Sequence, residues 1–140
     1  MKRTAASVDD HLAAIGGQRG EDMRLLDRSI REQLPGQPRF LYEGTFWGGS
    51  DQQIVGYGTM DYVNRSGESV EWFLVGLAAQ KNYISIYVNA VEDGAYLLAA
   101  YKDRLGKVKA GSASISFGNV DDLEFETLME LIGRTGKKAR

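Results

Sequence analysis

The sequence predicts a single α+β domain built around an antiparallel sheet. Helical periodicity is concentrated near the two ends of the chain and in one short later segment, whereas residues 39–89 show the alternation of strands. The separators inside this region, residues 65–68 and 80–82, are too short for the crossovers of a parallel sheet. A chain of 140 residues has the ordinary size of one domain, so residues 1–140 are expected to form one unit with a frayed tail at 136–140.

Two helices are expected near the N-terminus. Ser7 precedes Asp10 by the spacing of a capping box, with Asp in place of Glu, and three apolar residues then recur on one helical face: Val8, Leu12 and Ile15. Glycines at 16, 17 and 20 should break this helix. The second helix is predicted from spacings of three and four, and Pro35 with Gly36 should end it; its apolar residues are Met23, Leu26, Ile30 and Leu34.

The strands of residues 39–89 are rich in β-branched and aromatic residues. After the second separator, Ile84, Ile86 and Val88 alternate with a polar and aromatic set, which is the period of a half-buried strand. One face should therefore meet the core and the other should be amphipathic; the amphipathic set is Tyr83, Ser85, Tyr87 and Asn89. Neighbouring residues of a strand point to opposite faces, so Trp72 and Phe73 are expected on opposite sides, with at least one in the core.

Three elements are expected after residue 89. Residues 95–105 have the pattern of a helix ended by Gly106. A strand should follow, with Ala113, Ile115 and Phe117 on one face and three serines on the other: Ser112, Ser114 and Ser116. The last element is predicted to be a helix from its apolar stripe of Phe125, Leu128, Met129 and Ile132.

Composition limits the classes of partner and compartment. The net charge of −2 mixes 17 basic with 19 acidic residues, so no field favours nucleic acid. The absence of cysteine excludes disulfides, thiolate metal sites and cysteine nucleophiles within this chain, and it suits a reducing compartment. No apolar run follows the N-terminus, so neither a signal peptide nor a membrane span is expected. A cytoplasmic location is the expectation.

Three segments, together with the flanking helices, resemble the YdhG-like domain-of-unknown-function family: residues 43–49, 77–87 and 105–111. The resemblance implies a compact sandwich similar to frataxin, with helices on one face of an antiparallel sheet. At least one family member is regarded as an intracellular iron chaperone. The leading hypothesis is therefore a non-enzymatic binding or chaperone module with an accessory role in iron handling.

Four carboxylates are the candidate ligands for weakly bound iron: Asp9, Asp10, Glu21 and Asp22. Oxygen ligands suit weakly held iron, calcium or magnesium, and the glycines between the first two helices could fold these side chains together. The competing interpretation is capping and dipole compensation, because all four lie in first turns of helices. The same region carries as many basic as acidic residues, unlike an acidic ridge. A second acidic edge at Asp122, Glu126 and Glu130 could attract a cation, because like charges at this spacing repel, but a solvated helix face is the commoner explanation.

The alternative hypothesis is a metal-free module that binds a small anionic ligand or a protein through an aromatic and lysine-lined pocket. Its candidate residues are Trp47, Tyr57, Lys81, Lys107 and Lys109. Trp47 stands beside a Gly-Gly pair in an expected loop, where a large ring is either a lid or an anchor. The glycines around these aromatic residues also indicate that something approaches this surface closely. The 106–111 loop lacks the Gly-Lys-Ser/Thr ending of a P-loop and leads into a strand, so it offers at most a weak anion site with Lys81.

No catalytic constellation is visible in the sequence. His11 is the sole histidine, which excludes a two-histidine metal site, and no Gly-x-Ser-x-Gly elbow is present. A non-enzymatic protein is therefore expected. The outer sheet face, with its tyrosines and serines, is a candidate surface for a protein partner, although an ordinary solvated sheet explains the same residues.

Overall fold

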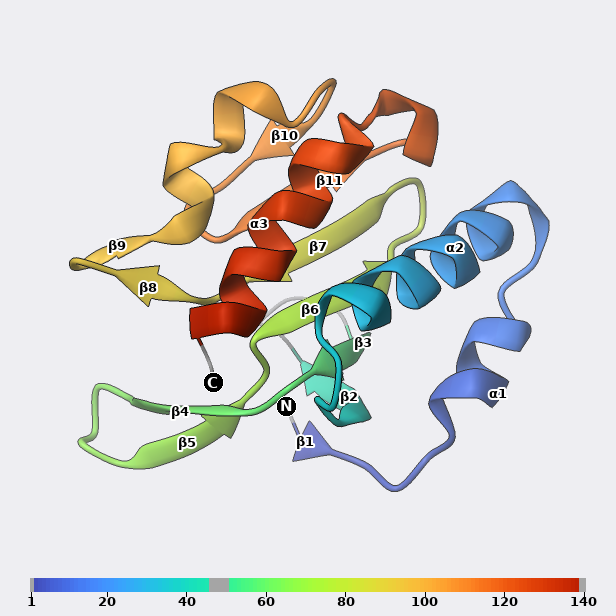
Figure 1. Cartoon of the computed structure of the whole chain (residues 1–140). Coiled ribbons are helices and arrows are strands. Elements are labelled where there is room, and N and C mark those ends of the chain that lie inside the picture. Colours follow the sequence, from blue (N-terminus) through green and yellow to red (C-terminus); the bar gives the residue numbers. More distant parts are fainter. Residues whose placement is uncertain (1, 46–50, 139–140) are drawn as a thin grey trace.

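The computed structural model describes residues 2–45 and 51–138. Within these residues, seven strands form one sheet, each antiparallel to its neighbours, in the order β1-β2-β3-β6-β7-β11-β10 (Figure 1). Their bounds are β1 (Lys2–Arg3), β2 (Arg39–Thr45), β3 (Asp51–Tyr57), β6 (Val75–Ala79), β7 (Ile84–Val88), β10 (Lys109–Ala110) and β11 (Ser114–Phe117).

Helices cover one face of this sheet. The long helices α2 (Gly17–Gln33) and α3 (Phe125–Lys138) lie across it, and α1 (Val8–Ala13) packs beside them near β2 (Figure 1). The main hydrophobic core fills the space between helices and strands, where Leu26, Ile86 and Leu128 are fully buried. The α+β fold class predicted from the sequence is confirmed.

The predicted start of the first helix is confirmed in detail. The hydroxyl of Ser7 accepts a hydrogen bond from the backbone N–H of Asp10 at 3.1 Å. The glycine break is also present, but Gly20 lies inside α2. A Cβ at Gly20 would stand 1.9 Å from the carbonyl oxygen of Ile15, so only glycine permits this corner between the two helices.

Two small hairpins leave the main sheet. Strands β4 (Met60–Val63) and β5 (Ser69–Trp72) pair with each other and project from it, with the predicted turn at their tip (Figure 1). Strands β8 (Val91–Glu92) and β9 (Ala95–Tyr96) form the second hairpin. The predicted turn at 80–82 is also present, between β6 and β7.

The helix predicted over residues 95–105 is wrong. The chain forms β9 and then two short 3₁₀ helices, η1 (Leu97–Ala100) and η2 (Lys102–Arg104), closed by tight hydrogen bonds such as Tyr101 N–H to Leu98 C=O at 2.9 Å. A third, η3 (Val120–Asp122), precedes α3. The tail was expected to fray from residue 136. Instead, α3 continues to Lys138, and Gly136 within it is buried.

Candidate functional site

The face of the sheet opposite α2 and α3, called here the outer face, is the one that the sequence predicted to be rich in tyrosine and serine. The strand pairing confirms that prediction, since Tyr87 lies opposite Ser114 and Ser85 lies opposite Ser116. Ser85 and Tyr87 are only 4% and 9% exposed, so the alternative of an ordinary solvated sheet does not describe these two residues. A second hydrophobic cluster covers this face, made of Tyr42, Ile54, Phe73, Ala78 and Tyr87 with Phe40 and Trp72 packed against it.

Two paired glycines let aromatic rings lie directly on the outer face. Gly56 of β3 stands opposite Gly76 of β6. A Cβ at Gly56 would be 2.4 Å from Cε1 of Tyr42, and one at Gly76 would be 2.5 Å from Cε1 of Phe73. The two rings pack edge to face, with centroids 5.2 Å apart. The close approach that the glycines indicated is therefore made, at these two positions, by the chain's own side chains.

Trp72 lies on top of this layer. Its ring stacks on Phe73 with centroids 4.5 Å apart and 27° between the planes. The prediction that these two residues point to opposite faces is wrong, because β5 ends at Trp72 and the chain bends before β6. Asn89 secures the bend: its Nδ2 donates to the carbonyl of Phe73 at 2.9 Å, and its backbone N–H donates to that of Leu74 at 2.9 Å.

A pocket of about 350 Å³ opens beside the Trp72 stack. Its lining comes from the end of β5, from β7 and β9, and from the segment entering β11: Trp72, Tyr87, Asn89, Tyr96, Ser112, Ala113 and Ser114. The strand period brings Tyr87 and Asn89 to the same face as the two serines. The volume is near the lower end of the range for small-molecule sites, and three aromatic and three polar residues among the seven lining residues give the mixed walls that such sites have.

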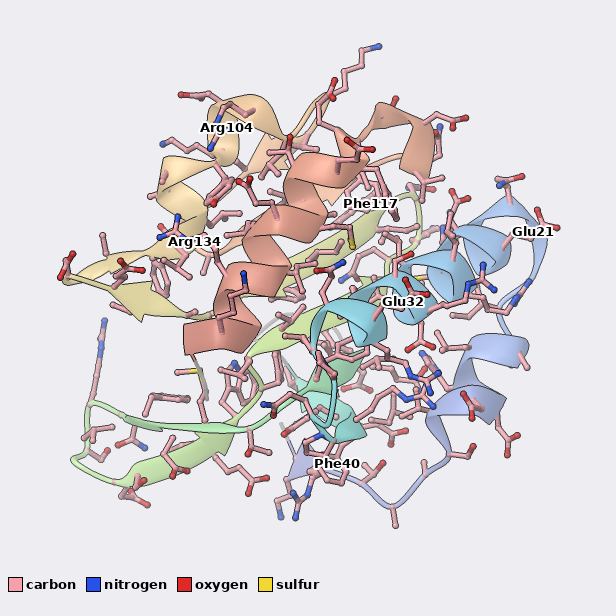
Figure 2. The ribbon with its side chains drawn as sticks, viewed as in Figure 1. Glu21, Glu32, Phe40, Arg104, Phe117 and Arg134 are labelled. Atoms are coloured by element: carbon pink, nitrogen blue, oxygen red, sulfur yellow. The ribbon has the colours of Figure 1, made fainter. Side chains whose placement is uncertain are left out.

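The walls of the pocket are held by contacts outside it. Burial raises the pKa of the Tyr87 phenol, and interactions with the side chains of Ser85 and Gln80 oppose this shift. Arg134 of α3 reaches the β8–β9 hairpin that carries Tyr96 (Figure 2), with Nη2 3.2 Å from Oε2 of Glu92. The ion pair therefore links α3 to the hairpin from which Tyr96 comes.

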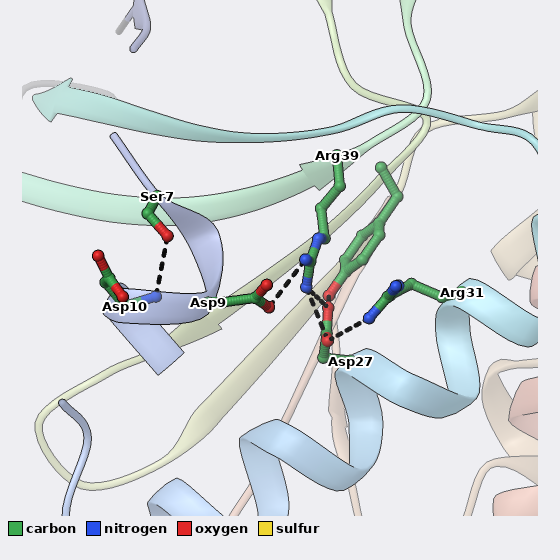
Figure 3. Close-up of polar contacts among 7 residues, drawn as sticks. Ser7, Asp9, Asp10, Asp27, Arg31 and Arg39 are labelled. Carbon is green, nitrogen blue, oxygen red and sulfur yellow. Dashed lines mark hydrogen bonds and ion pairs between the residues drawn. The ribbon is translucent and has the colours of Figure 1, made fainter. Parts of the chain in front are cut away.

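A buried ionic network occupies the opposite, helix-covered side of the sheet (Figure 3). Asp27, 5% exposed, accepts two hydrogen bonds from Nη1 of Arg39 at 3.0 and 2.9 Å and one from the hydroxyl of Tyr57 at 2.7 Å. Arg39 also donates through Nη2 to Asp9 at 2.8 Å, and Arg31 stands 3.6 Å from Asp27. The network ties α1 and α2 to β2 and β3.

The network explains two perturbed pKa values. Burial and the adjacent Asp27 carboxylate raise the pKa of Tyr57 well above its usual value. Desolvation alone would lower the pKa of Arg39, but its hydrogen bonds and its attraction to Asp27 and Asp9 raise it overall. Sequence reasoning did not single out Asp27 or Arg39 as partners. A carboxylate inside the apolar stripe of α2 was the available signal, since charges are rarely buried unless paired.

The four predicted metal ligands have different surroundings. Asp9 is paired with Arg39, and exposed Asp10 lies in the first turn of α1. Glu21 is exposed on α2 and labelled in Figure 2, whereas Asp22 is buried, accepting hydrogen bonds from Gln18 Nε2 at 2.8 Å and from the N–H of Val120 at 3.2 Å. In the parts of the chain that the structure describes, no group of three or more His, Cys, Asp or Glu side chains could hold a metal ion.

Of the five residues predicted to bind a ligand, the four that the structure describes do not line the pocket of the outer face. Trp47 lies outside the described residues. Tyr57 is buried, and its hydroxyl donates to Asp27 on the helix side. Lys81, Lys107 and Lys109 are exposed, the first in the β6–β7 turn and the others at or beside β10. Two of the residues that line the pocket, Tyr87 and Asn89, belong to the surface predicted to bind a protein partner. Tyr83, another residue of that predicted surface, is exposed and precedes β7.

Comparison with known proteins found no matching family model, no matching curated protein and no matching solved structure. The YdhG-like resemblance stays a prediction, and so does iron handling, which depends on it. Among the described residues, no helix has both the length and the apolar character needed to cross a membrane.

Proposed function

We propose that this protein is a non-enzymatic binding module that takes a small organic molecule in the pocket of the outer face. The single observation that supports this is the pocket itself, in which three aromatic side chains and an oriented amide surround about 350 Å³. The glycine pair, the Phe73–Trp72 stack and the Asn89 hydrogen bonds fix its shape, and a site formed in advance loses little entropy on binding.

The pocket changes the class of ligand expected from the sequence. A small anionic ligand was expected to meet lysines, but among the described residues that line this pocket there is neither lysine nor arginine. Affinity should therefore come from ring contacts and hydrogen bonds and should depend weakly on salt. We also propose a cytoplasmic location, which the absence of cysteine suits.

The test is a protein-observed NMR titration with three probes: benzamide, N-acetylglucosamine and tetramethylammonium. The resonances to follow are the side-chain amide of Asn89 and the indole N–H of Trp72. Tyr96→Leu removes an aromatic wall, and Tyr83→Leu is the matched control, because Tyr83 has a similar exposure, 44% against 40%, and does not line the pocket.

Saturable shifts at Asn89 and Trp72 that weaken in Tyr96→Leu and persist in Tyr83→Leu would support the proposal. If no probe shifts these resonances, or if both variants respond as the wild type does, the pocket is not a binding site of this kind.

A further inference from the structure

We infer that the pocket of the outer face selects small alkylammonium ions over neutral and anionic molecules. This inference rests on the proposed binding function and names its ligand class. It follows from what the lining residues present to a ligand: aromatic rings, a hydrogen-bond acceptor of fixed orientation, and no basic side chain.

The aromatic walls attract cations. The electron-rich faces of tryptophan and tyrosine stabilise ammonium groups, tryptophan most strongly, and the attraction grows as water is excluded. Trp72 is held against Phe73, Tyr42 and Tyr62 at centroid distances of 4.5, 5.8 and 6.3 Å, so its ring is a rigid wall. Tyr87 also lines the pocket and is 9% exposed, so it supplies a second aromatic side chain that is largely shielded from water.

Asn89 supplies the acceptor. The carbonyl of Phe73 can only accept a hydrogen bond, so the amide nitrogen of Asn89 must face it, as the 2.9 Å contact shows. This fixes Oδ1 as the remaining polar atom of the side chain, and no described residue donates to it at hydrogen-bond distance. An acceptor beside aromatic rings suits a ligand with a cationic N–H, because hydrogen bonds from a charged donor are the stronger ones.

The absence of opposing charge completes the selection. Among the described residues that line the pocket, none is lysine or arginine, so a cation meets no repulsion and an anion meets no compensating charge. Ser112, which precedes β11, and Ser114, the first residue of β11, also line the pocket and add hydroxyl oxygens that can accept.

The experiment compares three molecules of nearly equal shape by NMR titration at neutral pH. N,N-dimethylethanolammonium carries a charge and an N–H, choline carries the charge alone, and 3,3-dimethylbutan-1-ol is neutral. We expect the first to bind most tightly and the neutral alcohol about tenfold more weakly than choline, with Tyr96→Leu weakening both cations about three- to tenfold and Tyr83→Leu leaving them unchanged.

The outcomes separate this inference from the proposed function. If the neutral alcohol shifts the Asn89 amide at the same concentrations as the cations, the pocket binds molecules but the charge selection is wrong. If none of the three shifts Asn89 or Trp72, the ammonium assignment is wrong, and the titrations with benzamide and N-acetylglucosamine then decide whether the proposed binding function fails as well. A further arm uses N-acetyl-dimethyllysine methylamide: tighter binding than the free amine supports the ammonium assignment and places the group on a protein side chain, whereas weaker binding supports a free amine.

Discussion

Replacing Gly76 by alanine tests whether the glycine pair of the outer face exists to seat the Phe73 ring. The added Cβ would stand 2.5 Å from Cε1 of Phe73 and 3.0 Å from Cγ2 of Ile54. Carbon atoms in contact are separated by about 3.5–4.0 Å, so the Phe73 ring must move by roughly 1 Å, and the stacked Trp72 must move with it.

The cost follows from two opposing terms. Overpacking of this kind destabilises by about 1–3 kcal/mol. Alanine also restricts the unfolded chain, which returns about 0.4–1 kcal/mol, because Gly76 does not have a positive φ and its backbone accepts a side chain. The free energy of unfolding should fall by about 1–2 kcal/mol, which lowers the melting temperature by about 3–8 °C for a domain of this size.

Gly111→Ala is the matched control. Its Cβ would meet the hydroxyl of Ser114 at 3.1 Å, the end of a side chain that can rotate, and the carbonyl oxygen of Ser114 at 3.8 Å, an ordinary contact distance; the backbone there also lacks a positive φ. Urea unfolding should show Gly111→Ala equal to or slightly more stable than the wild type, and near-ultraviolet circular dichroism should change only in Gly76→Ala. Equal stabilities for Gly76→Ala and the wild type would refute the packing account.

Three further predictions concern other parts of the molecule. Asp27→Asn leaves Arg39 without its buried charge partner and should lower the free energy of unfolding by about 3 kcal/mol in urea, and a loss under about 1 kcal/mol would contradict the role of the network. Tyr42→Phe removes a buried hydroxyl that has no hydrogen-bond partner among the described residues, so thermal unfolding should show unchanged or higher stability. Burial lowers the pKa of His11, with Glu43 opposing, so the unfolded chain binds the proton more readily and stability should fall as the pH drops below about 6.5. His11→Leu should flatten that slope in melting temperatures recorded between neutral pH and about pH 5, and an unchanged slope would count against this assignment.

Local signals predicted much of the fold. The Ser7 cap, the two separators and the alternation around Ile86 each depend on a few neighbouring residues, and all are confirmed. The helix predicted over 95–105 shows the limit of such patterns. Its apolar residues are indeed buried, at Leu97, Leu98, Tyr101 and Leu105, but the chain enters from a hairpin whose turn has Asp93 and Gly94 at positive φ. The spacing of apolar residues predicts which side chains are buried. It does not predict whether the backbone forms an α-helix or 3₁₀ helices, because that depends here on the β8–β9 hairpin that comes before.

The candidate site was predictable only in part. The sequence placed Tyr87, Asn89 and the serines on one face, because strand period is a local property. It could not bring Trp72 there, since that depends on a bend after β5 and on two glycines from different strands that meet only in the folded sheet. It also left Asp27 without its partner Arg39, which lies on another element twelve residues later.

The most direct test of the central claim is a crystal structure of the protein soaked with N,N-dimethylethanolammonium. The account predicts density for the ligand between Trp72, Tyr96 and Asn89, with its nitrogen within hydrogen-bond distance of Oδ1 of Asn89. A ligand bound elsewhere, or a pocket closed by movement of the Trp72 ring, would contradict it.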